Sequence, residues 1–510
     1  MLAKVWSAAT FGIDAVRITI EVDASRGEMP RFTMVGLPDA AVREAYSRVR
    51  SALYNCGLQF PNCNLTVNLS PADVKKEGSG FDLPIAVGIL HASELLRDEH
   101  LEGRVFVGEL SLDGTLAPVR GALSITAALA RDTSVREVIV PAANANEAAA
   151  VESVAVVGVP HLPALIDHLR GESIIDRCVS SGVPEETAES ADFAEVRGQA
   201  QAKRALEVAA AGGHNLLMIG PPGSGKTMLA RRLPSILPRL NLDESIETTK
   251  IHSVAGTLAP GSGLLSRRPF RAPHHTISNA GLVGGGSNPR PGEVSLAHHG
   301  VLFLDEMPEF RRDVLEVMRQ PMEDGFVTIS RASRTLTFPS RFTLAAALNP
   351  CPCGYFNDIR RQCGCTPQQI ARYLARISGP LLDRIDLQVE VPALTTAEIS
   401  SASQGESSMT IRARVESARD IQRQRFRRSA IQCNAEMSSR HLRSHCQLDA
   451  PSRKILEQAL DRLALSARAY DRILKVARTI ADLASSETIE TAHLAEAIQY
   501  RALDRAYFRS

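Results

Sequence analysis

A lysine and a threonine close a glycine-rich stretch in a spacing suited to nucleotide phosphates. The segment Gly220-Pro221-Pro222-Gly223-Ser224-Gly225-Lys226-Thr227 fits the pattern G-x-x-x-x-G-K-[ST]. Its glycines let backbone N–H groups approach phosphate oxygens, and a helix N-terminus favours the same anion. We expect Lys226 to reach the β- and γ-phosphates and Thr227 to bind Mg²⁺. A plain glycine turn is the alternative, which the apolar run before the segment disfavours.

Two adjacent carboxylates supply the second half of such a site. Asp305 and Glu306 follow the apolar run 301–304, which predicts a buried strand that ends at the active site. We expect Asp305 to hold Mg²⁺ through water, and Glu306 to orient and deprotonate the attacking water. The two halves together predict an ATPase that uses ATP and Mg²⁺.

Later segments carry further polar candidates. Asn349 ends the predicted strand 342–348, where its amide can hold the lytic water or sense the γ-phosphate. Arg384, which stands between two aspartates, could act as an arginine finger in a neighbouring subunit, with a salt bridge as the alternative. At the start of a predicted C-terminal helix, we expect Arg468, or otherwise Arg472, to close over the nucleotide.

Four of the nine cysteines form two Cys-x-Cys pairs, Cys351 with Cys353 and Cys363 with Cys365. Two close turns that carry four thiolates suit tetrahedral Zn²⁺. The spacing is tighter than the usual Cys-x₂-Cys, so free thiols remain the alternative.

Arginines also mark the tip of a predicted hairpin over 325–344. Arg331 and Arg334 could hold DNA phosphates there, and a plain surface turn is the alternative. Between the two halves of the ATP site, residues 251–299 predict a mobile loop that faces a polyanion or a neighbouring subunit, with a plain solvated loop as the alternative.

Length and composition bound the class of protein. The 510 residues predict two to four domains, and 44% hydrophobic with 23% charged residues is typical of a globular chain. A net charge of +1 means that any binding to DNA must come from local patches. We find no apolar run of the roughly 18 residues that a bilayer requires and no secretory signal. We therefore expect a cytoplasmic protein with no membrane partner and mostly reduced cysteines.

The pattern of elements predicts an α/β protein with five segments. They are a mixed unit over 1–175, a linker over 176–194, an ATPase core over 195–394, a second linker over 395–408 and a helical end over 409–510.

Two motifs in the first segment, 35–39 and 107–114, resemble the Lon-protease-like domain, an α+β fold of ribosomal S5 type. Gly80 stands where the resemblance places the nucleophile, and Leu123 where it places the dyad lysine. Ser79 is the one remaining candidate nucleophile. We therefore expect a structural or DNA-contacting domain that is proteolytically inactive.

The order of Gly220–Thr227, Asp305–Glu306, Asn349, Arg384 and Arg468 resembles AAA+ ATPases, as Walker A, Walker B, sensor 1, arginine finger and sensor 2. The flanking sequences resemble the magnesium-chelatase and MCM-helicase branch, in which Glu323 would touch the neighbour's nucleotide, with a surface salt bridge as the alternative. Nearly the whole chain is similar to one family, the YifB/ComM magnesium-chelatase-like proteins.

That resemblance implies a Lon-like domain, an AAA+ P-loop core and a helical lid, assembled as a homo-hexameric ring. It also implies a DNA helicase that drives branch migration on single-stranded or branched DNA in natural transformation, alongside the recombinase machinery. A chelatase-type ATPase that remodels a protein partner is the alternative.

Overall fold

The computed structural model describes most of the chain. The described residues are 1–26, 30–180, 182, 191–286, 289–331, 334–358, 361–394, 405–429, 431–463, 466–503 and 507–508. Residues 181 and 183–190 of the first expected linker and residues 395–404 of the second therefore lie outside them. So do Ala332 and Ser333 at the hairpin tip, together with the side chains of Arg331 and Arg334.

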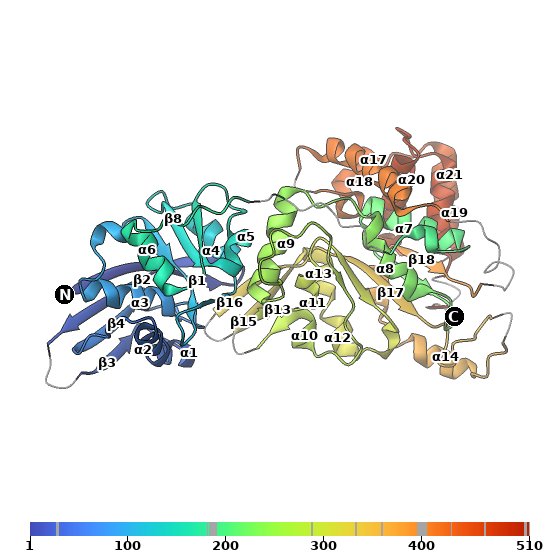
Figure 1. Ribbon diagram of the computed structural model, residues 1–510. Helices are drawn as coiled ribbons and strands as arrows, with labels where there is room; N and C mark the ends of the chain where they lie inside the picture. Colours follow the sequence, from blue (N-terminus) through green and yellow to red (C-terminus); the bar gives the residue numbers. More distant parts are fainter. Residues whose placement is uncertain are drawn as a thin grey trace. The chain divides into compact units, whose positions relative to one another are not determined.

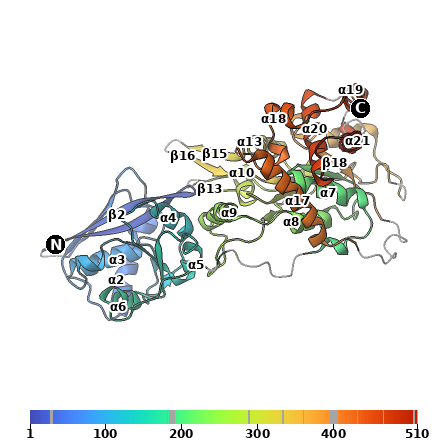
Figure 2. The same ribbon diagram turned by 90° about the horizontal axis from the view of Figure 1, so that it is seen from above.

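The chain divides into two compact units (Figures 1 and 2). The first unit comprises Met1–Glu185, Asn241–Ser266 and Ser330–Phe338; the second comprises Glu186–Leu240, Arg267–Ile329 and Pro339–Ser510. The first unit thus takes in two segments that lie, in sequence, within the expected ATPase core.

A seven-stranded mixed sheet forms the centre of the first unit, in the order β3-β4-β2-β1-β5-β8-β9. Its strands are β1 Leu2–Phe11, β2 Asp14–Ser25, β3 Phe32–Val35, β4 Asn64–Ser70, β5 Arg104–Phe106, β8 Glu137–Pro141 and β9 Ala155–Val159. The long strands β1 and β2 pair antiparallel from Leu2↔Asp23 to Phe11↔Asp14. From β1 onward through β5, β8 and β9 the pairing is parallel.

Helices and a small ribbon complete this unit. Every residue of α3, Asp82–Ala92, is buried, and the helix packs on β1 and β2, which fits its apolar surface on all sides. The amphipathic α2, Ala45–Asn55, buries Val49 and Leu53, as its periodicity predicts. The remaining elements are α1 Ala40–Arg43, α4 Ala122–Leu129, α5 Ala145–Ala148, α6 Leu162–Arg170, α9 Leu242–Ala255, and the ribbon of β6 Glu109–Leu110 with β7 Leu116–Ala117.

A five-stranded parallel sheet forms the centre of the second unit, in the order β11-β14-β17-β10-β18. Its strands are β10 Leu216–Ile219, β11 Phe270–Arg271, β14 Val301–Leu304, β17 Thr343–Leu348 and β18 Leu387–Glu390. Every residue of β10, β14 and β17 is buried, which explains their uninterrupted apolar runs. Because all strands run the same way, their carboxyl ends share one edge. The predicted α/β core is confirmed.

The loop expected over 251–299 is wrong in part, because the segment contributes to this sheet. Its strand β11 pairs with β14, and Phe270 stacks on Phe303 with ring centroids 6.0 Å apart. The apolar ring holds the strand at the sheet edge. Further short elements in the segment are α10 Asn279–Val283, β12 Gly284–Gly285, β13 Arg290–Pro291 and α11 Glu293–Leu296.

The predicted hairpin is confirmed as β15, Phe326–Arg331, paired with β16, Arg334–Pro339. The segment that leads to the hairpin forms two short helices, α12 Arg312–Glu316 and α13 Arg319–Asp324. Pro321 explains the break, because its ring has no N–H and would clash with the carbonyl of Val317 in a continuous helix.

Helices cover the sheet and form the C-terminal end of the second unit. They are α7 Ala200–Gly212, α8 Lys226–Ile236, α14 Pro367–Leu374, α15 Gly379–Leu382, α17 Ser408–Phe426, α18 Ser439–His445, α19 Ala450–Leu463, α20 Ala467–Leu483 and α21 Thr491–Gln499. The helices α17 to α21, orange to red in Figure 1, gather into one bundle. Within the described part of the chain, no helix combines the length and apolar character needed to cross a bilayer.

Candidate active site

The glycine-rich loop joins β10 to α8 through glycines that no other residue could replace without strain. Gly223 and Gly225 have φ angles of +73° and +89°, and Gly225 is the N-cap of α8. At Gly220, a Cβ atom would clash with the carbonyl oxygen of Val391. The backbone is therefore shaped for close approach, and the positive end of α8 points into the turn.

Lys226 lies at the centre of this loop and is only 8% exposed. Its Nζ donates to the carbonyl oxygens of Gly220, at 2.7 Å, and Pro221, at 2.9 Å, and to Asn349 Oδ1 at 3.3 Å. Burial lowers the pKa of Lys226 to about 8, and the nearby carboxylates of Asp305 and Glu306 offset part of that effect. The ammonium group is thus bound to groups that phosphate oxygens can replace.

The predicted Mg²⁺ ligands are in direct contact. Thr227 Oγ1 donates to Asp305 Oδ2 at 2.6 Å, while Asp305 Oδ1 accepts the backbone N–H of Glu306 at 2.9 Å. Hydroxyl and carboxylate oxygens are the donors that Mg²⁺ prefers, so these two residues fit the ion. Glu306 itself has a left-handed backbone with φ +50°, a strained conformation of the kind found at functional sites.

Strand order explains how these residues meet. The strand β17, which Asn349 follows, lies between β14 and β10. Asp305 and Glu306 follow β14, and the glycine-rich loop follows β10. The structure thus brings together the predicted loop, carboxylates and amide at the carboxyl edge of three adjacent strands, where open α/β sheets bind ligands.

Arg384 is buried, at 6% exposure, and has partners within its own chain. It forms an ion pair with Glu323 and donates to the carbonyl oxygen of Pro380 at 2.6 Å. The hydrogen bond from Arg384 lowers the pKa of Glu323. The two residues line a cavity of about 580 Å³ together with Arg319. Neither flanking aspartate is the partner that the salt-bridge alternative had suggested.

The two helix arginines differ in environment. Arg468 is exposed on the first turn of α20, and its charge contributes to lowering the pKa of Glu323. Arg472 forms an ion pair with Asp386, which also contacts His214 Nδ1 at 3.2 Å. Arg472 is therefore engaged in structure, and Arg468 is the one that is exposed near the Arg384 cavity.

Tyr373, near the end of α14, is a residue of the site that our sequence analysis missed. It is 6% exposed, and its hydroxyl lies close enough to the backbone N–H of Asn349 for that group to favour the charged form of the tyrosine. Burial raises its pKa, with smaller contributions from Glu309 and Glu306. An aromatic on the apolar face of a short helix normally indicates core packing, so the sequence carried no signal of this placement.

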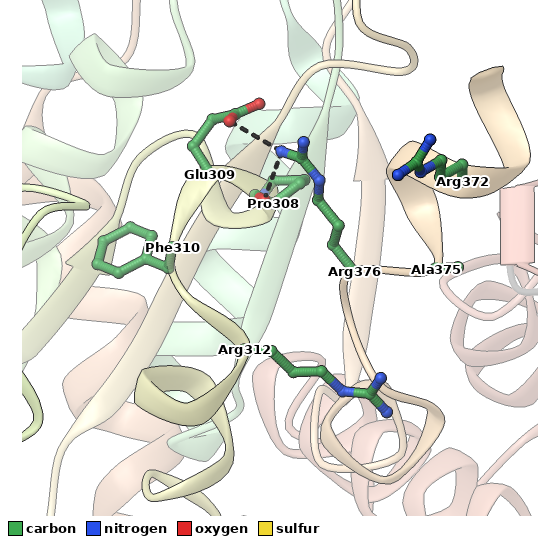
Figure 3. Close-up of a pocket in the computed structure, with 7 residues that line it drawn as sticks. All are labelled: Pro308, Glu309, Phe310, Arg312, Arg372, Ala375 and Arg376. Carbon is green, nitrogen blue, oxygen red and sulfur yellow. Dashed lines mark hydrogen bonds and ion pairs between the residues drawn. The ribbon is translucent and has the colours of Figure 1, made fainter.

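The turn after Glu306 is tied to the same end of α14. Arg376 donates to Glu309 Oε2 at 2.8 Å and to the carbonyl oxygen of Pro308 at 3.2 Å (Figure 3). Arg376, Pro308 and Glu309 line a cavity of about 470 Å³. Arg312 and Arg372 also line this cavity. The loop that carries Glu306 is thus fixed from outside the sheet.

The four cysteines of the two Cys-x-Cys pairs converge. Sγ–Sγ distances are 3.3 Å for Cys351–Cys353, 3.7 Å for Cys351–Cys363 and 3.6 Å for Cys353–Cys363, and all four sulfurs lie within 4.8 Å of one another. A tetrahedral site with Zn–S bonds of about 2.3 Å has sulfur–sulfur edges of about 3.8 Å. The cluster therefore matches the size of a Zn–S₄ site.

Among the described residues of the first unit, no Ser–Lys pair lies at the expected place. The hydroxyl of Ser79 donates to Glu109, and Leu123 is fully buried. Lys76, the lysine nearest to Ser79 in sequence, donates to the carbonyl oxygen of Pro71. A serine nucleophile needs a base within hydrogen-bond reach, so this arrangement does not favour proteolysis.

Three family models match most of the chain. They are "Subunit ChlI of Mg-chelatase" over residues 20–144, "Magnesium chelatase, subunit ChlI" over 192–399 and "Magnesium chelatase, subunit ChlI C-terminal" over 405–501. The competence protein ComM of Haemophilus influenzae is 47% identical over 99% of this chain and 98% of its own length. The chain belongs to the YifB/ComM family of magnesium-chelatase-like proteins.

Other YifB/ComM proteins are comparably similar. Uncharacterized proteins named YifB from Salmonella typhimurium and Escherichia coli are 46% and 44% identical, each over 99% of this chain and 98% of its own length. Membership in this AAA+ family indicates ATPase activity with ATP and Mg²⁺ as ligands. The geometry of the glycine-rich loop and of the Thr227–Asp305 pair fits both ligands.

Proposed function

We propose that this YifB/ComM protein is an ATP-driven DNA motor that works as a homo-hexameric ring in the cytoplasm. Its ATPase cycle would promote branch migration of single-stranded or branched DNA, together with the recombinase machinery, in homologous recombination during natural transformation. The convergence of Lys226, Thr227, Asp305 and Asn349 at one sheet edge carries the ATPase half of the proposal. The 47% identity to a competence protein supports the DNA half.

In the proposed mechanism, Lys226 exchanges its bonds to loop carbonyls for phosphate oxygens. Thr227 and Asp305 hold Mg²⁺, which supplies charge neutralisation when bound. Glu306 removes a proton from the attacking water, which Asn349 helps to orient.

Hydrolysis also requires residues from outside this cluster. Arg384 would leave Glu323 and neutralise transition-state charge on the nucleotide of the adjacent subunit. Arg468 would close over the nucleotide from the first turn of α20.

Contact with DNA is assigned to the hairpin of β15 and β16. We propose that Arg331 and Arg334 bind backbone phosphates, so that nucleotide-dependent movement of the hairpin pulls on the strand. Binding of this kind weakens with salt, because neutralised phosphates release counterions.

The cysteine cluster completes the proposed cofactor set with one Zn²⁺. Four thiolates at tetrahedral spacing favour Zn²⁺ over the hard cations, which take oxygen ligands.

The family descriptions support a second candidate, because they name a chelatase subunit rather than a DNA enzyme. In this candidate the same ATPase would remodel a protein partner. The partner, and not DNA, would then stimulate hydrolysis.

A strand-displacement assay on branched DNA, run beside an ATPase assay, separates the candidates. The wild-type chain should displace a strand, DNA should stimulate its ATPase, and both effects should fall with salt. Lys226→Ala should abolish hydrolysis and displacement. A double variant, Arg331→Ala with Arg334→Ala, should keep basal hydrolysis and lose stimulation by DNA.

Exposed arginines on α18 provide the matched control. Arg440→Ala with Arg443→Ala removes the same charge and should leave stimulation by DNA intact. If low-salt conditions gave neither binding nor stimulation by DNA, the motor proposal would be wrong. ATPase stimulation by a protein partner in the absence of DNA would support the second candidate.

A further inference from the structure

The first Cys-x-Cys turn packs against the nucleotide loop. Cys351 follows Asn349 by two residues, so the metal ligand and the candidate sensor share one short segment. Gly354, with φ +86°, lies flat on the ring of Pro222, where a Cβ atom would come within 2.5 Å of Cδ and 2.7 Å of Cγ. No side chain fits between this turn and the glycine-rich loop.

The second Cys-x-Cys pair leads directly into α14. Thr366, next to Cys365, is the N-cap of this helix, and a capping box with Gln369 and a proline at the first helical position define where the helix begins. Because Cys365 is covalently next to the N-cap, the position of the second pair in space determines where the first turn of α14 lies.

The far end of α14 reaches back to the catalytic residues. Arg376 donates to Pro308 and Glu309 in the turn after Glu306, and Tyr373 is buried beside Asn349. The segment from Asn349 to Arg376 thus leaves the sheet at the sensor and returns to the sensor and the Glu306 turn.

Three of the four cysteines lie outside the apolar core, and Cys351 is buried. Cys353 is exposed, and Cys363 and Cys365 are half-buried. The backbone N–H of Cys365 donates to Cys363 Sγ at 3.4 Å, as backbone N–H groups do around metal-bound thiolates. A short turn without a core requires a cross-link to hold one shape, and a metal ion bound by four thiolates supplies it.

We propose that a Zn²⁺ ion on Cys351, Cys353, Cys363 and Cys365 is a positioning centre for ATP hydrolysis. By joining the two turns, it fixes Gly354 on the nucleotide loop and α14 on the sensor. Tyr373 is then a positioning residue, which holds Asn349 through its backbone. This inference rests on the proposed ATPase.

Metal occupancy should affect turnover more than nucleotide binding. Lys226 donates to the carbonyl oxygens of Gly220 and Pro221 in its own loop, whereas the Glu306 turn is held by Arg376 at the end of α14. A displacement of about 1 Å at reacting groups costs about a hundredfold in rate. Loss of the ion should therefore lower kcat by about ten- to a hundredfold, while the dissociation constant for a fluorescent ATP analogue changes much less.

The test compares Cys365→Ser, which removes a ligand, with Cys365→His, which supplies another zinc ligand. Cys63→Ser is the control, because Cys63 lies in the first unit outside the cluster. Each full-length protein is assayed for zinc by elemental analysis, for analogue binding, and for kcat and KM. We expect one zinc per chain in the wild type and the control, loss of zinc and of kcat in Cys365→Ser, and recovery of both in Cys365→His.

A second variant tests the link through α14 and leaves the ligands intact. Tyr373→Phe removes only the hydroxyl, so it should keep zinc, melting temperature and analogue binding while kcat falls severalfold. Unchanged kcat in both Tyr373→Phe and zinc-free Cys365→Ser would overturn the positioning role.

Absence of zinc from wild-type protein purified without chelator would overturn the metal site. If zinc-loaded wild type bound the analogue and did not hydrolyse ATP, the proposed function and the coupling would both fail, while zinc content would still decide the metal site on its own.

Discussion

At the scale of single residues, the site depends on charges that are costly to bury. The Lys226 ammonium and the Asp305 carboxylate each have a partner that a ligand can replace: loop carbonyls for the lysine and the Thr227 hydroxyl for the aspartate. These neutral partners provide hydrogen bonds to the charged groups and leave the net charge of each group unchanged. The unliganded site is therefore stable enough to fold and still poised for phosphate and Mg²⁺.

Replacing the candidate base should separate binding from hydrolysis. Glu306→Gln keeps the size of the side chain and removes its ability to accept a proton, so we expect ATPase activity to fall by at least about a hundredfold. Binding of the fluorescent ATP analogue should persist. Asp313→Asn, on the nearby helix α12, removes one exposed ion pair and should change activity less than about twofold. Equal effects in the two variants would contradict the role of Glu306.

Lys226 should make nucleotide binding dependent on pH. Burial lowers its pKa to about 8 from 10.5, so the lysine is increasingly neutral above pH 8. Phosphate oxygens favour the charged form, so binding above pH 8 must take up a proton. Affinity should then fall by up to about tenfold per pH unit. Calorimetry at pH 9 in buffers of different ionisation enthalpy should detect this uptake, and at pH 7 should detect none from this group.

At the scale of elements, a buried polar network joins the helical bundle to the sheet. Asp386, just before β18, pairs with Arg472 of α20, and His214 contacts both Asp386 and Thr479, at 3.2 and 2.8 Å. A hydrogen bond from His214 and the charge of Arg472 outweigh burial and lower the pKa of Asp386, while burial lowers the pKa of His214. The network positions the start of α20, which carries Arg468.

Both pKa shifts predict destabilisation by acid. The unfolded chain protonates His214 near pH 6.5, before the folded chain does, so stability falls as pH drops below that value. The contribution of Asp386 is present above its unfolded pKa, and it is lost as pH falls further.

Breaking this network should be more costly than removing a nearby aspartate. Asp386→Asn removes the buried carboxylate that Arg472 and His214 share, and we expect a loss of about 3–5 kcal/mol in stability. Asp383→Asn, in the same turn, should change stability by less than about 0.5 kcal/mol. Thermal melting of the two variants checks this, and similar melting temperatures would contradict the structural role of Asp386.

At the scale of the whole molecule, each chain on its own holds its candidate arginine finger away from solvent. Arg384 is paired with Glu323, so it would become available to another subunit only when that pair opens. The proposed ring supplies a reason for opening, because the phosphates of an adjacent subunit would compete with Glu323 for the guanidinium group.

Mixing two inactive variants should restore activity if sites are shared. Arg384→Ala subunits keep Glu306, and Glu306→Gln subunits keep Arg384, so an interface between the two can be complete. Random mixing in a ring makes about one quarter of interfaces complete. We therefore expect ATPase activity near that fraction of wild type in an equimolar mixture, and almost none in either variant alone. An inactive mixture in which native mass spectrometry detects mixed rings would contradict a shared site.

Local patterns located much of this protein before any packing was known. Three motifs could be recognised in the sequence because their chemistry requires particular residue types at fixed spacing. They are the glycine-rich loop, the Asp305–Glu306 pair and the two Cys-x-Cys pairs. The apolar runs before the glycine-rich loop and before Asp305 also predicted buried strands, since strands covered on both faces are continuously apolar. Whole-chain similarity then indicated the family.

Only the tertiary structure decided which distant residues meet. The order of the strands places Asn349 beside Lys226. The path of α14 places Tyr373 beside Asn349. Arg384 forms its ion pair with Glu323 and not with the aspartates next to it in sequence. Such contacts depend on how helices and strands pack, and side-chain identity along the chain does not specify them. A motif indicates the chemistry of a site. The distant residues that contact the motif are determined by how the whole unit packs, because packing sets the free energy of the folded state.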